Sequence, residues 1–196
     1  YNNSRDNTLT LEQSQSRTSR TVTSNHLERN RLFASKLTLG YPLLGGNLSA
    51  GAEYTYTNRN DDYINPEHYV PTSYAQLKES NIAPFVEYTH MLPICQLTVG
   101  LRWENTRFNY YEDGQHVPSQ SRSFSNLFPS ISAATQIGNV QLQLAYAAKT
   151  RRPSYSQLSN NVSYGNRFLL QSGNPLLKHE YIHTISLGGA WKFIQF

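Results

Sequence analysis

Two histidines four residues apart, His179 and His183, enclose Glu180 in an HExxH string. Metalloproteases use this string on a helix, where both histidines face one zinc ion and the glutamate acts as general base. The residues that follow, including Tyr181 and Ile185, favour a strand. On a strand, residues four apart are separated by about 13 Å, which is too far to share one ion. We therefore predict no metal site and no protease activity at this string.

The sequence gives little sign of hydrolase activity, nucleic-acid binding or disulfide formation. The chain contains no G-x-S-x-G nucleophile elbow, although serines are abundant and a barrel-borne hydrolase stays a minor alternative. The net charge of +4 comes from arginines scattered along the chain, whereas nucleic-acid binders concentrate them on one face. The lone Cys95 has no disulfide partner in the chain. We predict no catalytic residues, no cofactor and no nucleic-acid partner.

Tyrosines in polar stretches are the best ligand-binding candidates, because tyrosine offers a large contact area and one hydrogen bond at low entropic cost. The alternative for each is packing against a neighbouring loop. Arg152, next to Arg151, could contact a ligand, but we favour pairing with acidic residues or anchoring of its loop. The candidate residues are Tyr63, Tyr69, Tyr74, Tyr110, Tyr111, Tyr155, Tyr164 and Arg152.

Apolar and polar residues alternate with a period of two along most of the chain, which is typical of strands with two different faces. The predicted hairpins are 31–57, 80–107 and 124–150, and a further strand covers 179–193. Short turns at 43–47, 92–94 and 138–139 alternate with long polar stretches at 58–78, 108–123 and 151–178. This pattern predicts an all-β, antiparallel up-and-down meander over 29–196. Residues 1–28 are predicted to be a polar extracellular loop or N-terminal extension, with 8–12 as a candidate short strand.

The polar faces carry charges in mid-strand, at Lys36, Glu53, Glu87, Arg102 and Glu104. These side chains would face solvent in a small soluble barrel and a wet lumen in a membrane barrel. Alternation alone does not separate these two arrangements. Tyrosine and tryptophan at strand ends favour the membrane version, since aromatic girdles lie at both membrane interfaces.

One register prediction follows for the strand around Arg102. The apolar residues of this strand are expected on the outer face, and Arg102 and Glu104 are expected to point into the lumen. An arginine facing lipid in mid-membrane would cost about 2–4 kcal/mol. The expected outer residues are Leu97, Val99, Leu101 and Trp103.

Composition is compatible with a barrel wall that carries large polar loops. The 196 residues include 14 Tyr and 8 Phe, and only 15% are charged. No apolar run approaches the roughly 20 residues of a membrane helix, which excludes helical spans but not a barrel. Since the sequence starts at Tyr1 and stops at Phe196 after a strand, we expect it to be a fragment of a larger chain.

Three motifs carry a resemblance to a known family: Phe128-Pro129-Ser130, Arg152-Pro153-Ser154-Tyr155 and Gly173-Asn174-Pro175 with Lys178 and Glu180. The chain resembles the barrel of TonB-dependent outer-membrane receptors, in particular their tyrosine-rich "outer membrane protein β-barrel" group. His179 stands where this family usually has proline. The resemblance implies a 22-stranded transmembrane barrel, of which this chain is about seven strands. It also implies a structural role for Arg152, Pro153, Tyr155, Gly173, Asn174, Pro175, Lys178 and Glu180. Gly173-Asn174-Pro175 is expected to form a turn, because glycine and asparagine tolerate positive φ and proline fixes the exit of the turn.

The function implied by the resemblance is import of a nutrient across the outer membrane of a Gram-negative bacterium. The implied partners are outer-membrane lipid, a small nutrient ligand or an accessory surface lipoprotein, and TonB through a plug domain that this sequence lacks. The alternative is a binding module that does not transport. It would be an adhesin at the surface or a soluble β-barrel with its apolar face inside.

Overall fold

The computed structural model describes residues 1–13, 15, 17–191 and 194–195. Within them, the chain forms one ten-stranded antiparallel sheet and a separate two-stranded hairpin. The sheet runs in the order β1-β2-β3-β4-β5-β7-β8-β11-β12, and β6 pairs with β5. Its strands are β1 (Asn2–Glu12), β2 (Arg20–Leu43), β3 (Gly46–Ile64), β4 (Ser73–Met91), β5 (Gln96–Glu112), β6 (Gln115–His116), β7 (Arg122–Ile137), β8 (Val140–Arg151), β11 (Glu180–Trp191) and β12 (Ile194–Gln195). The separate hairpin pairs β9 (Val162–Asn166) with β10 (Leu169–Ser172), and two short helical turns are η1 (Pro118–Gln120) and α1 (Tyr155–Leu158).

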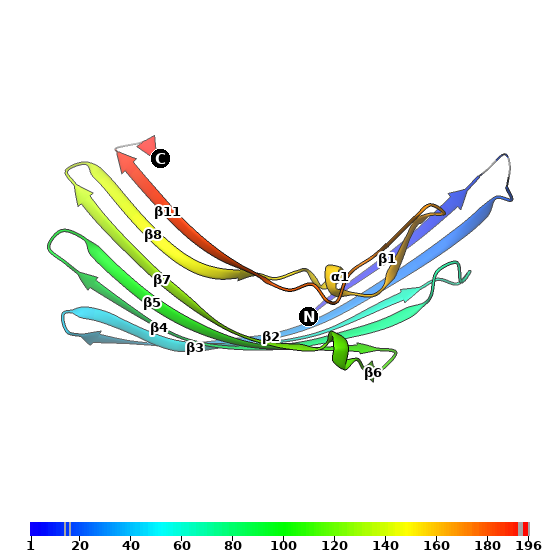
Figure 1. Cartoon of the computed structure of the whole chain (residues 1–196), viewed down its shortest axis with the longest axis horizontal. Helices are drawn as coiled ribbons and strands as arrows, with labels where there is room; N and C mark the ends of the chain where they lie inside the picture. The colour runs from blue at the N-terminus through cyan, green and yellow to red at the C-terminus, as the bar shows by residue number, and fades with distance from the viewer. Residues whose placement is uncertain (14, 16, 192–193, 196) are drawn as a thin grey trace.

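The sheet is a curved wall with one concave and one convex face (Figure 1). Short turns join the strands at one end, as in the pair Leu44-Gly45, whose φ angles of 48° and 77° fit a two-residue hairpin. At the other end the connections are longer, and α1 lies on the concave side of the sheet (Figure 1). The antiparallel up-and-down meander and its alternation of short and long connections are therefore confirmed.

Register places the apolar residues on the convex face. Leu48, Tyr88, Val99 and Ile131 are cross-strand neighbours in one row. The concave face is identified by α1, whose Leu158 packs against the buried residues Ala75, Leu77, Phe108 and Tyr110. Because side chains alternate along β5, Arg102 and Glu104 share the concave face with Phe108 and Tyr110. The predicted register of residues 97–104 is confirmed.

The convex face changes from apolar to polar partway along the strands. In β3 the apolar belt runs from Leu48 to Tyr56, a length that lets a tilted strand cross the hydrocarbon core in about 9–11 residues. Large side chains in the belt remain uncovered, such as Ile185 at 76% and Leu187 at 74% exposure. Beyond the belt, on the side of the long connections, one convex row consists of Arg31, Asn58, Lys78 and Asn109. This polar row extends the wall past the belt into water.

The strands are longer than the sequence predicted. The polar stretches 58–78 and 108–123 contain the ends of β3, β4 and β5. Within residues 1–28, predicted as a loop or extension, 2–12 form β1 and 20–28 form the start of β2, which pairs with it. Sequence alternation marks a strand only where one face is apolar. In the polar ends of these strands, cross-strand ion pairs add to the backbone hydrogen bonds, such as Arg29–Asp62 at 2.8 Å and Arg59–Glu28 at 2.7 Å. Residues 192–193, the end of the predicted strand 179–193, lie outside the described part of the chain.

In the described part of the chain, β1 and β12 end the sheet without pairing to each other. The sheet therefore sets no strand number for a closed barrel, and the 22-stranded size remains an expectation from the resemblance. None of the described helices is long and apolar enough to span a membrane.

Candidate functional site: the inward-folded segment and the concave wall

The connection between β8 and β11 folds back onto the concave wall, and we call residues 152–178 the inward segment. It begins with a capping box: the Ser154 backbone N–H donates to Gln157 Oε1 at 2.9 Å, and the Ser154 side chain accepts from the Gln157 N–H. This exchange satisfies two helix-end groups and sets the single turn α1. Leu158, at the end of α1, is then buried in the concave cluster of β4 and β5.

Arg152 anchors the start of the inward segment to the wall. Its guanidinium bridges Glu79 and Glu104, each at 2.9 Å, and donates to Thr106 Oγ1 at 3.0 Å. Tyr155 lies under the guanidinium of Arg59, whose carbon is 5.6 Å from the ring centroid. The predicted pairing of Arg152 with acidic residues of the lumen face is therefore what the structure contains.

The Gly173-Asn174-Pro175 motif holds the other end of the segment against α1. The Asn174 N–H donates to the Gln157 carbonyl at 2.6 Å, and Asn174 Oδ1 accepts from the Leu176 N–H at 2.9 Å. The predicted turn is present, since the Leu177 N–H donates to the Asn174 carbonyl at 3.1 Å, but neither Gly173 nor Asn174 has the positive φ that was expected. A Cβ at Gly173 would lie 2.5 Å from the Gln157 carbonyl oxygen and 2.6 Å from those of Ser156 and Ser159. Glycine is needed here for close backbone approach.

We expect Gly173→Ala to displace α1 and to lower stability, because the added methyl group meets fixed backbone oxygens. Overpacking of this kind typically costs about 1–3 kcal/mol. Gly188→Ala in β11 is the matched control, since a Cβ there meets nothing within 4 Å. Thermal unfolding in detergent should show a loss for Gly173→Ala only. Equal stability of the two variants would contradict the packing of Gly173 against α1.

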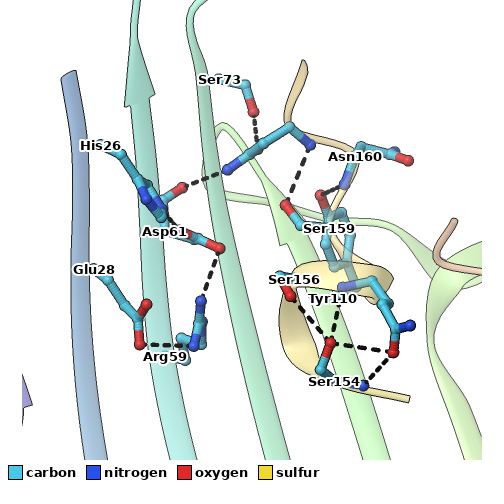
Figure 2. Close-up of polar contacts among 12 residues, drawn as sticks. His26, Glu28, Arg59, Asp61, Ser73, Tyr110, Ser154, Ser156, Ser159 and Asn160 are labelled. Atoms are coloured by element: carbon cyan, nitrogen blue, oxygen red, sulfur yellow. Dashed lines mark hydrogen bonds and ion pairs between the residues drawn. The ribbon is translucent and has the colours of Figure 1, made fainter. Parts of the chain in front are cut away.

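A groove of about 470 Å³ lies between the inward segment and the wall. A charged network forms its wall side: His26 pairs with Asp61, and Arg59 joins Asp61 to Glu28 at 3.3 and 2.7 Å (Figure 2). Asn161 donates to the Asp61 carbonyl at 3.2 Å and accepts from Ser73. Most of the lining residues carry a hydroxyl or amide group, including Ser156, Gln157, Ser159, Asn161, Ser163 and Asn174, although apolar atoms contribute much of the exposed lining.

Pairing favours the charged forms of His26 and Asp61. The hydrogen bond to Asp61 raises the pKa of His26 above its usual value, although burial opposes this. Burial alone would raise the pKa of Asp61, but His26 and Arg59 lower it. Stabilisation by His26 is thus complete below its unfolded pKa near 6.5 and is lost as pH rises through the higher folded value. The lowered Asp61 pKa keeps the carboxylate ionised over that window.

A second anchor fixes the hairpin β9–β10 to β1 and β2. Glu12 accepts hydrogen bonds from Arg20 Nε at 2.8 Å, the Tyr164 hydroxyl at 2.7 Å, and the backbone and Nε of Arg167 at 2.7 and 2.9 Å. Val22 packs beside Tyr164 in the adjoining buried cluster. Burial would raise the pKa of Glu12, but the bonds from Tyr164, Arg167 and Arg20 lower it to about 2.

Attachment of the β9–β10 hairpin should therefore depend on pH. Because the pKa of Glu12 is lowered in the folded protein, its carboxylate stabilises the fold fully above the unfolded pKa of 4.5. This stabilisation is lost as pH falls towards about 2. We expect amide exchange of 162–172, corrected for intrinsic rates, to accelerate across that range. Glu12→Gln should show fast exchange already at pH 7, and Glu180→Gln, which removes an exposed pair with Arg151, should not. A flat profile in the wild type would contradict the anchor.

The structure separates the tyrosine candidates. Tyr63 lines the groove, whereas Tyr155 packs under Arg59 and Tyr164 donates to Glu12, and neither of these two lines the groove. Tyr110 is fully buried and accepts a bond from the Asn160 N–H at 3.4 Å. Tyr69 stacks under Arg20 at 4.5 Å in the loop after β3 and does not line the groove. Tyr74 and Tyr111 alternate onto the convex face, where Lys78 covers Tyr111 at 4.6 Å.

The HExxH residues are divided between the two faces. His179 Nε2 lies 3.3 Å from Asn126 Nδ2, on the concave side, whereas His183 Nδ1 bonds the hydroxyl of Tyr146, in the convex row of Ile131, at 2.8 Å. Glu180 pairs with Arg151 at 2.7 Å. No three metal-binding side chains converge within the described residues. We still predict that purified protein carries no stoichiometric zinc and that chelation leaves its unfolding temperature unchanged.

Several important residues were not foreseen from the sequence. Glu79 and Glu12 acquire their roles only when the inward segment meets the wall, and His26 and Asp61 pair across β2 and β3 in a stretch without an apolar face. Pro175 is buried at the end of the segment, while Lys178 is exposed. The one local signal was the Ser154-x-x-Gln157 spacing, which matches a capping box.

A comparison with protein families and with curated proteins completes the description of the site. A family model described as the outer membrane protein beta-barrel family matches residues 1–195, which is nearly the whole chain. No curated protein matches the chain.

Proposed function

The chain belongs to the outer membrane protein beta-barrel family, and from that premise we propose that it is part of the wall of a TonB-dependent receptor that imports a nutrient. Family membership places the chain in the outer membrane of a Gram-negative bacterium. In this proposal the convex apolar belt meets lipid, and the long connections lie at the extracellular end. The proposed barrel is of the 22-stranded type.

The observation that carries the proposal is the groove between the inward segment and the concave wall. It lies beyond the apolar belt, at the end where a ligand would enter, and it is lined by hydroxyl and amide groups that can exchange hydrogen bonds with a polar solute. A segment held inside the wall by Arg152 and Glu12 narrows the lumen at that level. Both features suit capture of a ligand before its passage.

The proposed partners follow from the same mechanism. A polar nutrient would bind first at the long connections, alone or delivered by a surface lipoprotein. TonB would supply energy through a plug domain outside this sequence. The proposal assigns no bond chemistry to the chain and no cofactor.

Growth tests in the native bacterium examine the proposal. A deletion strain and a strain that lacks TonB should share a growth defect on the same nutrient source, and deleting both genes should add nothing. Asn161→Ala, which removes a side chain from the groove without touching the belt, should reduce growth at low nutrient concentration only. A deletion that impairs adhesion, with growth unchanged on every nutrient, would favour the non-transporting binding module instead.

A further inference from the structure

A second, partly open cavity of about 40 Å³ lies under the inward segment, and Leu177 lines both this cavity and the groove. Its floor is the concave wall, where Arg122 of β7 neighbours Phe108 of β5. Its roof comes from the inward segment, through Pro153, Leu158 and Leu177. A water molecule needs roughly 10–15 Å³ by the same measure, so the space suits a single small group rather than a whole large ligand.

Arg122 is the feature of this cavity that the fold leaves unexplained. Its Nη1 donates to the Leu177 carbonyl at 2.8 Å. Its Nη2 is covered and has no hydrogen-bond partner in the described part of the chain, where no carboxylate pairs with this guanidinium either. Burial lowers the pKa of Arg122, with no acidic neighbour to offset it. A covered N–H group without an acceptor is costly, so the unpaired Nη2 of Arg122 needs an explanation.

Among the described residues, the other neighbours of Arg122 add polar groups to the cavity without adding a carboxylate beside the guanidinium. His179 lies beside it, with its ring edge-on to Phe124 at 4.5 Å between centroids. Burial lowers the pKa of His179, and the charges of Arg152 and Arg122 lower it further. Asn126, whose amide lies 3.3 Å from His179 Nε2, and Thr106 add polar groups to the lining.

Glu79 is the acidic residue in the lining, and it is already engaged. Arg152 holds its Oε1 at 2.9 Å, and this ion pair reduces the repulsion between Glu79 and an incoming anion. Arg152 thus neutralises the acidic side of the cavity, and Arg122 is left without a counter-charge. A guanidinium in this state matches a planar or tetrahedral oxyanion through paired N–H···O bonds.

We propose that this cavity binds a carboxylate or phosphate group of a small ligand, with Arg122 as its principal contact. Phe108, Leu158 and Leu177 exclude water from the contact and strengthen it. The inference does not require that the barrel transports its ligand, and it would hold equally for a barrel that only binds.

Titrations with inorganic phosphate and with acetate test the site. Protein extracted from the membrane in detergent is titrated at constant ionic strength, and the unfolding temperature is followed. Saturable stabilisation with a dissociation constant of about millimolar is expected for at least one anion. The anion that binds more tightly identifies phosphate or carboxylate as the natural group.

Arg122→Met should weaken that binding roughly tenfold or more, as expected for loss of a charge-assisted contact. Arg107→Met is the matched control, because Arg107 pairs across from Ser123 at nearly the same height but lies exposed on the convex face. It should bind as the wild type does. Without anion, Arg122→Met should be no less stable than the wild type, since it removes an unpaired buried charge.

Three results would overturn the site: no saturable effect of either anion on the wild type, equal weakening in both variants, or a strong loss of stability in anion-free Arg122→Met. Arg122→Gln keeps a polar side chain in place if the methionine variant does not fold. It should lose anion binding as well.

Discussion

Leu101→Arg should sharply reduce the amount of folded protein in the outer membrane. Leu101 lies in the apolar belt of the convex face, next to Val86 and Pro129, and is 46% exposed where lipid would contact it. Placing a guanidinium near the middle of the hydrocarbon costs about 2–4 kcal/mol. Heat-modifiability on gels would measure the loss of folded protein, and urea unfolding of the protein from lipid vesicles would measure the loss of stability.

Thr98→Arg in the same strand is the matched control. Thr98 faces the concave side, where its hydroxyl oxygen lies 3.1 Å from that of Thr89. On the same face, Arg102 forms ion pairs with Glu53 at 2.7 Å and Glu104 at 2.8 Å. An arginine there meets water and carboxylates. The account would fail if both variants folded equally well, or if Thr98→Arg were the more damaging change.

The second large effect concerns the chain in plain buffer. Residues 1–196 alone are expected to self-associate in the absence of detergent, because the convex belt is uncovered and the sheet ends at open strand edges. Unpaired edges recruit other chains, and backbone groups left unpaired are not tolerated in lipid. Light scattering should report large species in buffer and smaller ones once detergent is added.

Composition does not alter this expectation. The chain is polar on average, so the associated form could remain in solution, with copies paired edge to edge and belt to belt. A compact, stable monomer in detergent-free buffer would instead require the apolar side chains to be packed inside a small closed domain. That result would remove the membrane arrangement altogether.

Alternation identified the seven strands of the belt, since there each strand has one apolar face and Leu97, Val99 and Leu101 mark it directly. The polar extensions, such as Arg20 to Arg31 in β2, have no apolar face, so their pairing depends on neighbouring strands that the sequence does not reveal locally. Of residues 1–28, only the candidate strand 8–12 was predicted, and it lies within β1; the rest of β1 and the start of β2 were missed for this reason.

The inward segment shows a different limit of sequence-based prediction. The motif residues Arg152 and Gly173 were recognised as structural, but their partners, Glu79 and the carbonyls of α1, are distant in sequence or depend on close packing. Positive φ was the expected reason for Gly173, because turn chemistry is local and can be inferred from sequence. Close approach of two backbones is a tertiary property, which appears only in the folded chain.

Spin labels placed singly at positions 97–104, in a Cys95→Ser background and with the protein in its native membrane, test the central claim most directly. The claim predicts a period of two: labels at 97, 99, 101 and 103 should collide preferentially with oxygen dissolved in lipid, and labels at 98, 100, 102 and 104 with a water-soluble paramagnetic reagent. Equal water access at every position, or the inverse pattern with residue 102 in lipid, would contradict a lipid-facing convex wall around a polar lumen.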